Sequence, residues 1–417
     1  MSIIPKIAFI TPESPPFSGG GIATFINNIT KGLSQENIYC EVFTPALDQN
    51  TTISTLNNVI VHRIATQTLE TFRVDVVPYF LEQHKMKQFN IVESCEIHAC
   101  LRNLMEEEIE GLKYVIRVQM PFVYQNWLNN YYESRWLKLR YVVGALRRLK
   151  WDLGFWNIRD VKRHENLEYQ VCAKADFIIA PSNSFKKWLQ NFWQLKDKHI
   201  EIIYHLFDHS TLKGKNKVSS EMVNDFDVGN INILFVGKLN AHKGVVNLAK
   251  AAKKIIAKFP NTTFILIGED WDIKFKWKNI STSLLLKKIT NGSSKFQLIG
   301  KVSYQDLTTY YEIADICIFP SLWEAWGYTC TEAMSFGKPV IGSKFGGMAD
   351  AIQNEINGLL VNPFSVKAIE NTLERLVVDE GLRERLGNSA KYSVETTLNF
   401  RKLVLQNIDF YYKILNR

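Results

Sequence analysis

Short apolar runs alternate along the chain with longer segments whose apolar residues recur at helical spacing. Runs that are apolar throughout are typical of parallel strands buried on both faces of a sheet. The alternation predicts an α/β fold with doubly wound parallel sheets, in which ligands bind at the carboxyl ends of strands. We expect strands at residues 6–12, 39–44, 59–64, 90–94, 114–119, 177–181 and 202–205, and, after an interruption, at 231–238, 263–268, 295–299, 316–320, 339–343 and 358–361.

The interruption divides the chain into two predicted domains. Residues 206–230 are polar, charged and without periodicity, which is typical of an interdomain linker. The 417 residues also exceed what one hydrophobic core normally organises. We therefore expect a first domain at residues 1–205, a second at 231–393, and a C-terminal helix at 394–417, where apolar residues again recur at helical spacing.

The composition, with 46% apolar and 22% charged residues, is that of a globular protein. No run approaches the ~18 consecutive apolar residues that span a membrane, and the N-terminus has the pattern of a strand rather than a signal peptide. The six cysteines form no C-x-x-C pair, and the histidines form no H-E-x-x-H pattern. We expect a cytoplasmic protein with buried thiols, no metal and no cofactor.

The segment with the most candidate chemistry is 316–347. Its first predicted strand is followed by a turn with Glu324 and Gly327 and then by a helix with Glu332. A glycine lets the backbone approach a ligand at the helix start, where free N–H groups and the helix dipole favour an anion. Carboxylates accept hydrogen bonds from sugar hydroxyls, so the segment suits a ligand that is part phosphate and part polyhydroxyl. For either glutamate alone, a helix cap or a solvated face is the alternative.

Two other loops suit a phosphate. Gly19, Gly20 and Gly21 lie between the first strand and a predicted helix at 22–33, an arrangement that aims backbone N–H groups at phosphate. They do not form the G-x-G-x-x-G dinucleotide fingerprint, and a flexible connector is the alternative. Lys238 and Lys243 flank the turn after strand 231–238 and could both reach a pyrophosphate, or could both be solvated.

Segment 316–347 resembles the donor-site signature of the family-4 retaining glycosyltransferases with the GT-B fold: P-S-x-x-E, a glycine, a second glutamate, G-x-P-V and G-G. The matching residues are Pro320, Ser321, Glu324, Gly327, Glu332, Gly337, Pro339, Val340, Gly346 and Gly347. Segment 235–244 resembles the family's G-[R/K]-x-x-x-x-K-G element, with lysine where arginine is more usual. The resemblance implies two Rossmann-like domains facing each other across a cleft, and a C-terminal helix that packs on the first domain.

The resemblance also implies the reaction. A sugar would pass from a nucleotide-diphosphate sugar to a glycan or lipid-linked glycan, with retention of configuration, while two lysines and a helix N-terminus stabilise the leaving diphosphate without a metal. The catalytic candidates are Glu324, Lys238, Lys243 and Gln119. The donor-binding candidates are Gly19, Gly20, Gly21, Gly237, Lys238, Lys243, Glu324, Trp326, Gly327, Tyr328, Thr329 and Glu332.

Gln119 marks a departure from the family, which usually has histidine at this position, near the reacting sugar. A glutamine can hydrogen-bond a sugar hydroxyl, but it cannot carry a proton or a charge. We therefore expect either an altered acceptor chemistry or a slow enzyme.

Residues 134–151 combine six basic residues with aromatic and aliphatic ones and contain no acidic residue. This pattern suits an anionic membrane surface at the inner face of a membrane, or a lipid-linked acceptor. An ordinary core-facing helix with a basic outer face is the alternative. We expect no nucleic-acid partner, because no recognised binding module is present and the net charge of +8 is spread over a long chain.

Two other functions remain open at this point. A glycoside hydrolase could use Glu324 and Glu332 as an acid and nucleophile pair, although it would have no use for the two lysines. A non-catalytic sugar-nucleotide-binding protein of the same fold is the second alternative, and Gln119 is the residue that favours it.

Overall fold

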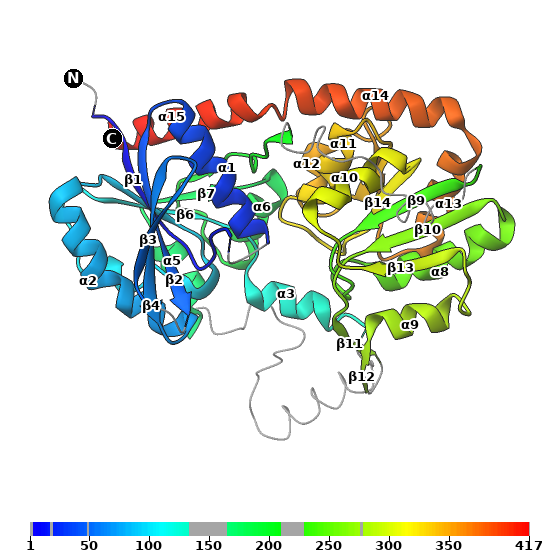
Figure 1. Ribbon diagram of the computed structural model, residues 1–417, viewed down its shortest axis with the longest axis horizontal. Helices are drawn as coiled ribbons and strands as arrows, with labels where there is room; N and C mark the ends of the chain where they lie inside the picture. Colours follow the sequence, from blue (N-terminus) through cyan, green and yellow to red (C-terminus); the bar gives the residue numbers. More distant parts are fainter. Residues whose placement is uncertain are drawn as a thin grey trace. The chain divides into compact units, whose positions relative to one another are not determined.

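The computed structural model describes residues 3–16, 20–47, 50–132, 165–209, 229–275 and 278–416. They form two compact units, each built on its own sheet (Figure 1). The first unit contains the described residues of 1–122, 157–208 and 399–417, and the second those of 123–156 and 209–398. Segment 123–132 thus groups with the second unit, although the sequence analysis assigns it to the first domain. Segment 134–151 and most of the expected linker lie outside the described residues.

The first unit has an eight-stranded sheet in the order β3-β4-β2-β1-β5-β6-β7-β8, parallel except for the β3–β4 pair. The strands are β1 (Lys6–Ile10), β2 (Tyr39–Leu47), β3 (Thr52–Leu56), β4 (Val59–Thr66), β5 (Ile91–Ser94), β6 (Lys113–Arg117), β7 (Phe177–Ala180) and β8 (Ile200–Ile202). The helices are α1 (Gly21–Gln35), α2 (Leu69–Lys87), α5 (Leu167–Lys174), α6 (Asn183–Phe192) and α15 (Phe400–Leu415), with short 3₁₀ turns at Ile97–Ala99 and Leu104–Glu106.

The second unit has a six-stranded sheet in the order β13-β10-β9-β14-β15-β16, with all neighbours parallel. Its strands are β9 (Ile231–Val236), β10 (Thr262–Ile267), β13 (Phe296–Gly300), β14 (Ile316–Phe319), β15 (Val340–Ser343) and β16 (Leu359–Val361), and a separate hairpin pairs β11 (Asp272–Phe275) with β12 (Lys278–Ser281). Its helices are α3 (Phe122–Asn129, in this unit from Val123 on), α8 (Val245–Lys258), α9 (Thr282–Ile289), α10 (Tyr304–Ile313), α11 (Tyr328–Ser335), α12 (Met348–Ala351), α13 (Val366–Val378) and α14 (Glu380–Thr396).

The two sheets confirm the predicted α/β class with doubly wound parallel sheets, and each expected strand overlaps an observed one. Strands β3, β11 and β12 were not expected from the sequence. Each is short and has few buried residues, so none produces the apolar run by which the other strands are found.

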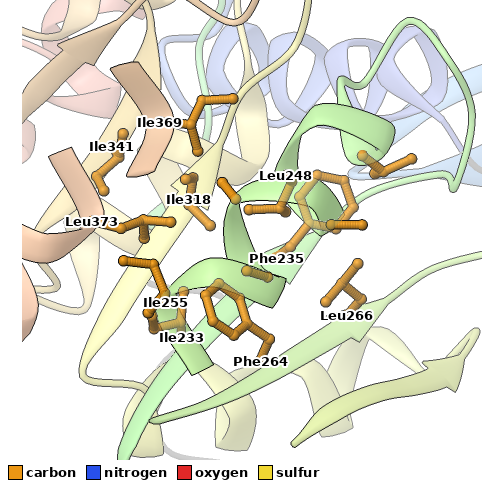
Figure 2. Close-up of a cluster of buried hydrophobic side chains, with 14 of the residues drawn as sticks. Ile233, Phe235, Leu248, Ile255, Phe264, Leu266, Ile318, Ile341, Ile369 and Leu373 are labelled. Atoms are coloured by element: carbon orange, nitrogen blue, oxygen red, sulfur yellow. The ribbon is translucent and has the colours of Figure 1, made fainter. Parts of the chain in front are cut away.

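The core of the second unit is packed between its sheet and the helices α8 and α13 (Figure 2). Alternate residues of β9, Ile233 and Phe235, meet Leu248 and Ile255 of α8, and Figure 2 also shows Leu373 of α13 in this cluster. Apolar residues recur every two positions on the strand and every three to four on the helix, so both elements direct apolar side chains into the same core.

Helix α15 packs on the first unit through both apolar and polar contacts (Figure 1, in red). The buried Arg117 of β6 donates from Nε to Glu93 Oε1 at 2.6 Å and from Nη2 to Asn407 Oδ1 of α15 at 2.6 Å. Tyr411 of α15 donates to Glu93 Oε2 at 2.8 Å. Where α15 crosses α1, Gly32 leaves room for the buried Val404, because a Cβ at Gly32 would overlap the valine side chain.

We predict that Gly32→Ala destabilises the first unit by about 1–3 kcal/mol, because it overpacks the α1–α15 contact. Alanine in an unobstructed helix would instead stabilise by about 0.5–1 kcal/mol. Gly381→Ala in α14 is the matched control, since a Cβ there meets only the Asp379 carboxylate at 3.7 Å. Hydrogen exchange of α15 amides measures the effect. Val404→Ala should relieve the overlap, and a double variant no more stable than Gly32→Ala would contradict the prediction.

Candidate functional site

The candidate site of the second unit lies where two neighbouring strands end. The chain runs from β9 outward to β10 and β13, then returns to place β14 on the other side of β9. Doubly wound sheets bind ligands at the carboxyl ends of strands where the order reverses in this way. The loops that leave β9 and β14 are residues 237–244 and 320–327, and they carry most of the candidate residues.

Close backbone packing joins these two loops. Leu322 N–H donates to the carbonyl of His242 at 2.8 Å, and Lys243 N–H donates to Asn240 Oδ1 at 3.1 Å within the first loop. Gly244 caps α8 with φ of 73° and lies so near the Pro320 carbonyl that a Cβ would overlap it. Only glycine satisfies both demands, which accounts for the glycine after Lys243.

The Gly346-Gly347 turn packs against the backbone of loop 320–327. Gly347 N–H donates to the Glu324 carbonyl at 2.7 Å. Gly346 has φ of 83°, and a Cβ there would overlap the backbone of Glu324. The paired glycines of the signature therefore set the backbone of Glu324 and do not need to contact a ligand themselves.

Glu324 is a nearly buried carboxylate that lies beside a lysine and a histidine. Lys243 Nζ donates to Glu324 Oε1, and His242 Nε2 lies 3.0 Å from the same oxygen. Burial would raise the pKa of Glu324, but Lys243 and His242 outweigh it and lower the pKa to about 2. Oε2 accepts no hydrogen bond from the described residues, so it is available to a sugar hydroxyl.

Lys238 has a different partner from Lys243. Its Nζ lies 4.5 Å from the centre of the Trp271 ring, a cation–π contact. Trp271 is 46% exposed and donates from Nε1 to Glu269 Oε2 at 3.0 Å. The sequence analysis did not select Trp271, because a single tryptophan in a loop carries no pattern.

Glu332 differs from Glu324 in that no cation among the described residues pairs with it. It is 5% exposed, and Tyr311 of α10 donates to its Oε2 at 2.9 Å. Burial raises the pKa of Glu332 to about 7, against the smaller lowering effect of this hydrogen bond. Tyr311 OH also lies 3.3 Å from the carbonyl of Thr329, so it ties Glu332 to the first turn of α11. Sequence reasoning missed Tyr311, which reads as an ordinary aromatic core residue.

Helix α11 begins beside this pair of glutamates. Gly327 caps it with φ of 106°, and Tyr328 and Thr329 form its first turn, where backbone N–H groups have no intrahelical acceptor. Such N–H groups and the helix dipole favour an anion. Trp326 is 3% exposed, so its side chain packs into the unit.

The remaining candidates belong to the first unit or lie outside the described residues. Gly19 is outside them, whereas Gly20 caps α1 and Gly21 begins it. Gln119 is 8% exposed, and its backbone N–H donates to both carboxylate oxygens of Glu96, at 3.0 and 2.8 Å. Phe122 N–H donates to Glu168 Oε2 at 3.0 Å, so two buried carboxylates hold this turn. Neither glutamate forms part of a recognisable sequence motif.

The described residues contain neither a candidate metal site nor a candidate membrane span. No group of three or more His, Cys, Asp or Glu side chains in this part of the chain is arranged to hold a metal ion. None of its helices combines the length and the apolar character that crossing a membrane requires.

Comparisons with known proteins find two glycosyltransferase family models that match this chain. The family described as "Glycosyl transferases group 1" matches residues 220–392, and "Glycosyltransferase Family 4" matches residues 19–211. An uncharacterized glycosyltransferase of Methanocaldococcus jannaschii is 24% identical over 413 residues, 97% of each chain. The capsular polysaccharide biosynthesis glycosyltransferase CapM of Staphylococcus aureus is 25% identical over 53% of this chain and 57% of its own.

Solved structures share the fold over nearly the whole chain. Sucrose-phosphate synthase from Thermosynechococcus elongatus has a TM-score of 0.75 at 18% identity and covers 99% of both chains. HepE from Anabaena, in complex with UDP and glucose, has a TM-score of 0.66 at 15% identity, over 97% of this chain and 98% of its own. With both family matches, these findings show that the chain belongs to the family-4 glycosyltransferases with the GT-B fold and is a glycosyltransferase.

Proposed function

We propose that this glycosyltransferase transfers a sugar from a nucleoside-diphosphate sugar to a glycan or lipid-linked glycan, with retention of configuration and without a metal. The observation that carries the proposal is the pairing of Lys243 with Glu324 at the switch point of the second sheet, next to the start of α11. A carboxylate for sugar hydroxyls and a cation for phosphate thus lie side by side, as a sugar diphosphate requires.

The donor's diphosphate would be recognised by positive charge. Breaking the bond between sugar and phosphate leaves negative charge on the departing nucleotide, and positive groups stabilise the transition state in proportion to that charge. Lys243, Lys238 and the N–H groups of Tyr328 and Thr329 can supply this stabilisation without a metal ion. HepE was solved with UDP, which makes uridine the first base to test.

The donor sugar would bind the free oxygen of Glu324. Because its pKa is held at about 2, Glu324 is ionised throughout the physiological range and accepts hydroxyl protons strongly. The same low pKa makes it unsuitable as the acid of a hydrolase, which needs a raised pKa to protonate its leaving group.

Retention would not require a protein base. The leaving phosphate can take the proton of the attacking hydroxyl, and Gln119 then needs only to hydrogen-bond the sugar, which glutamine can do. The glycan acceptor is supported by the likeness to CapM, a capsular polysaccharide biosynthesis enzyme. A lipid-linked acceptor and a peripheral position at the inner face of a membrane are proposals that rest on residues 134–151.

We predict that one nucleoside diphosphate among UDP, GDP and ADP raises Tm by about 5 °C at ~100 times its Kd, in the presence of EDTA. In Lys243→Ala the affinity should fall at least about tenfold, because a charge-assisted hydrogen bond is worth ~1.5–3 kcal/mol. Lys258→Ala, which removes an exposed lysine paired with Glu374, is the control and should bind like the wild type. If no nucleotide stabilises the wild type, the proposal fails, and a strict need for added metal would refute metal independence.

We also predict that affinity for the preferred nucleotide falls as the pH drops from 8 to 6. Glu332 has a pKa of about 7, so it loses the charge with which it would accept ribose hydroxyls over this range. Glu332→Gln should bind more weakly at pH 8, and its affinity should depend less on pH than that of the wild type. Because the nucleotide titrates identically with both proteins, the difference between their isothermal-titration profiles reports Glu332. Parallel profiles would contradict the assignment.

A further inference from the structure

His242 lies against the same carboxylate oxygen as Lys243, but the proposed reaction gives His242 no role. Its Nε2 is 3.0 Å from Glu324 Oε1, and its side chain is 4% exposed. We propose that His242 is a positioning residue, which holds the Glu324 carboxylate in place while Lys243 binds the diphosphate of the donor. The inference rests on the proposed function, because it assumes the roles of Glu324 and Lys243 given above.

Two groups compete for the ammonium group of Lys243, namely the carboxylate of Glu324 and the phosphate of a bound donor. Lys243 donates to Glu324, and its side chain, 26% exposed at the end of a flexible stem, can also turn toward a phosphate. A diphosphate carries more charge than a carboxylate and therefore competes for the three N–H donors of the lysine. Every donor that it takes leaves the buried Glu324 with less compensation for its charge.

His242 cannot move away in the same manner. Its carbonyl accepts from Leu322 N–H at 2.8 Å, and its own N–H lies 3.4 Å from Asn129 Oδ1. Both backbone groups are thus tied to other segments of the second unit, and the ring is buried beside Glu324. The imidazole therefore stays next to Oε1 whatever Lys243 does.

The geometry of Lys243 Nζ and His242 Nε2 would allow the imidazole to replace the lysine as the hydrogen-bond donor to Glu324. Lys243 makes a hydrogen bond to Glu324, whereas His242 Nε2 is close to the oxygen without pointing at it. A small rotation of the ring or the carboxylate would turn this contact into a hydrogen bond once Lys243 yields. The other ring nitrogen, Nδ1, has no partner in the part of the chain that the structure describes, so no competing bond opposes the rotation.

The pairing has a consequence for pH dependence. Lys243 and His242 are the charged or titratable groups set against Glu324 in the described structure, and both lower the pKa of Glu324 against the effect of burial. Removing the imidazole removes one of these influences, so Glu324 takes up a proton at a higher pH. At saturating donor, where the titration of Glu332 no longer limits binding, the acid limb of kcat should then move upward, which a purely structural role of His242 would not cause.

The test compares His242→Ala, His242→Gln and Asn240→Ala. Turnover is followed as release of nucleoside diphosphate from UDP-glucose, GDP-mannose or ADP-glucose, whichever matches the stabilising base, with water as acceptor. In His242→Ala, kcat should fall about 10- to 100-fold. The Kd of the nucleoside diphosphate should stay within about threefold of that of the wild type, because the imidazole holds the carboxylate and not the phosphate. The acid limb of kcat should shift to higher pH.

The other two variants separate positioning from loop structure. His242→Gln, whose side-chain amide can reach Oε1 with an N–H group, should recover at least about tenfold of the lost kcat. Asn240→Ala loses the turn hydrogen bond to Lys243 N–H but keeps the imidazole, so its acid limb should coincide with that of the wild type. If His242→Ala does not fold, His242→Asn replaces it, since its shorter amide cannot reach Oε1.

Wild-type kcat and an unmoved acid limb in His242→Ala would overturn the inference. If Lys243→Ala still lost nucleotide binding in the same experiments, the proposed function would stand without it. Failure of the wild-type protein to bind any of the three nucleotides would instead overturn the proposed function, and this inference with it.

Discussion

The negative charge of a buried carboxylate has to be balanced by neighbouring groups that attract or hydrogen-bond it. In the second unit this requirement determines how the candidate site is built. Glu324 is held ionised by Lys243 and His242, which come from the loop after a different strand. The two loops can supply this compensation only if their backbones approach closely, and Gly244 permits that approach, while Gly346 lets a third turn pack against the backbone of Glu324. These two glycines are thus explained by the need to position the charge of Glu324, which lies 80 positions from Gly244 and 22 positions from Gly346 in the sequence.

The two glutamates of the site show how environment divides one residue type between two roles. Glu324 has Lys243 and His242 beside it and a pKa of about 2, whereas Glu332 has a tyrosine beside it and a pKa of about 7. The first remains a strong acceptor under all ordinary conditions. The second changes its charge near neutral pH, so it makes the affinity of the site sensitive to conditions that leave Glu324 unaffected.

Buried carboxylates also surround Gln119, the functional candidate of the first unit. The turn that carries Gln119 has backbone N–H groups bound to Glu96 and Glu168, which are both buried and form no ion pair with another described residue. Burial raises the pKa of Glu96 to about 7 and that of Glu168 to about 8. These carboxylates hold a backbone, in contrast to Glu324, whose Oε2 accepts no hydrogen bond from the described residues. Arg117 and Glu93 form a buried ion pair that is also hydrogen-bonded to helix α15.

The sequence by itself determined the α/β class, nearly all of the buried strands and the two loops that hold Lys243 and Glu324. These follow from local patterns: apolar runs of strand length, glycines where the backbone turns, and a spaced signature within about thirty residues. It did not reveal His242, Tyr311 or Trp271 as partners of site residues. A histidine, a tyrosine and a tryptophan at single positions carry no periodic signal, and their roles exist only through contacts with residues 21 to 82 positions away.

Only the tertiary structure decided that β14 lies next to β9, which brings the loops together although about eighty residues separate them. The order of strands in a sheet is set by long-range packing that no local window contains. The charge states of the glutamates were likewise decided there, because a pKa depends on burial and on neighbours that the fold supplies. Local sequence specified which groups are present, and the packing of distant segments specified what each of them can do.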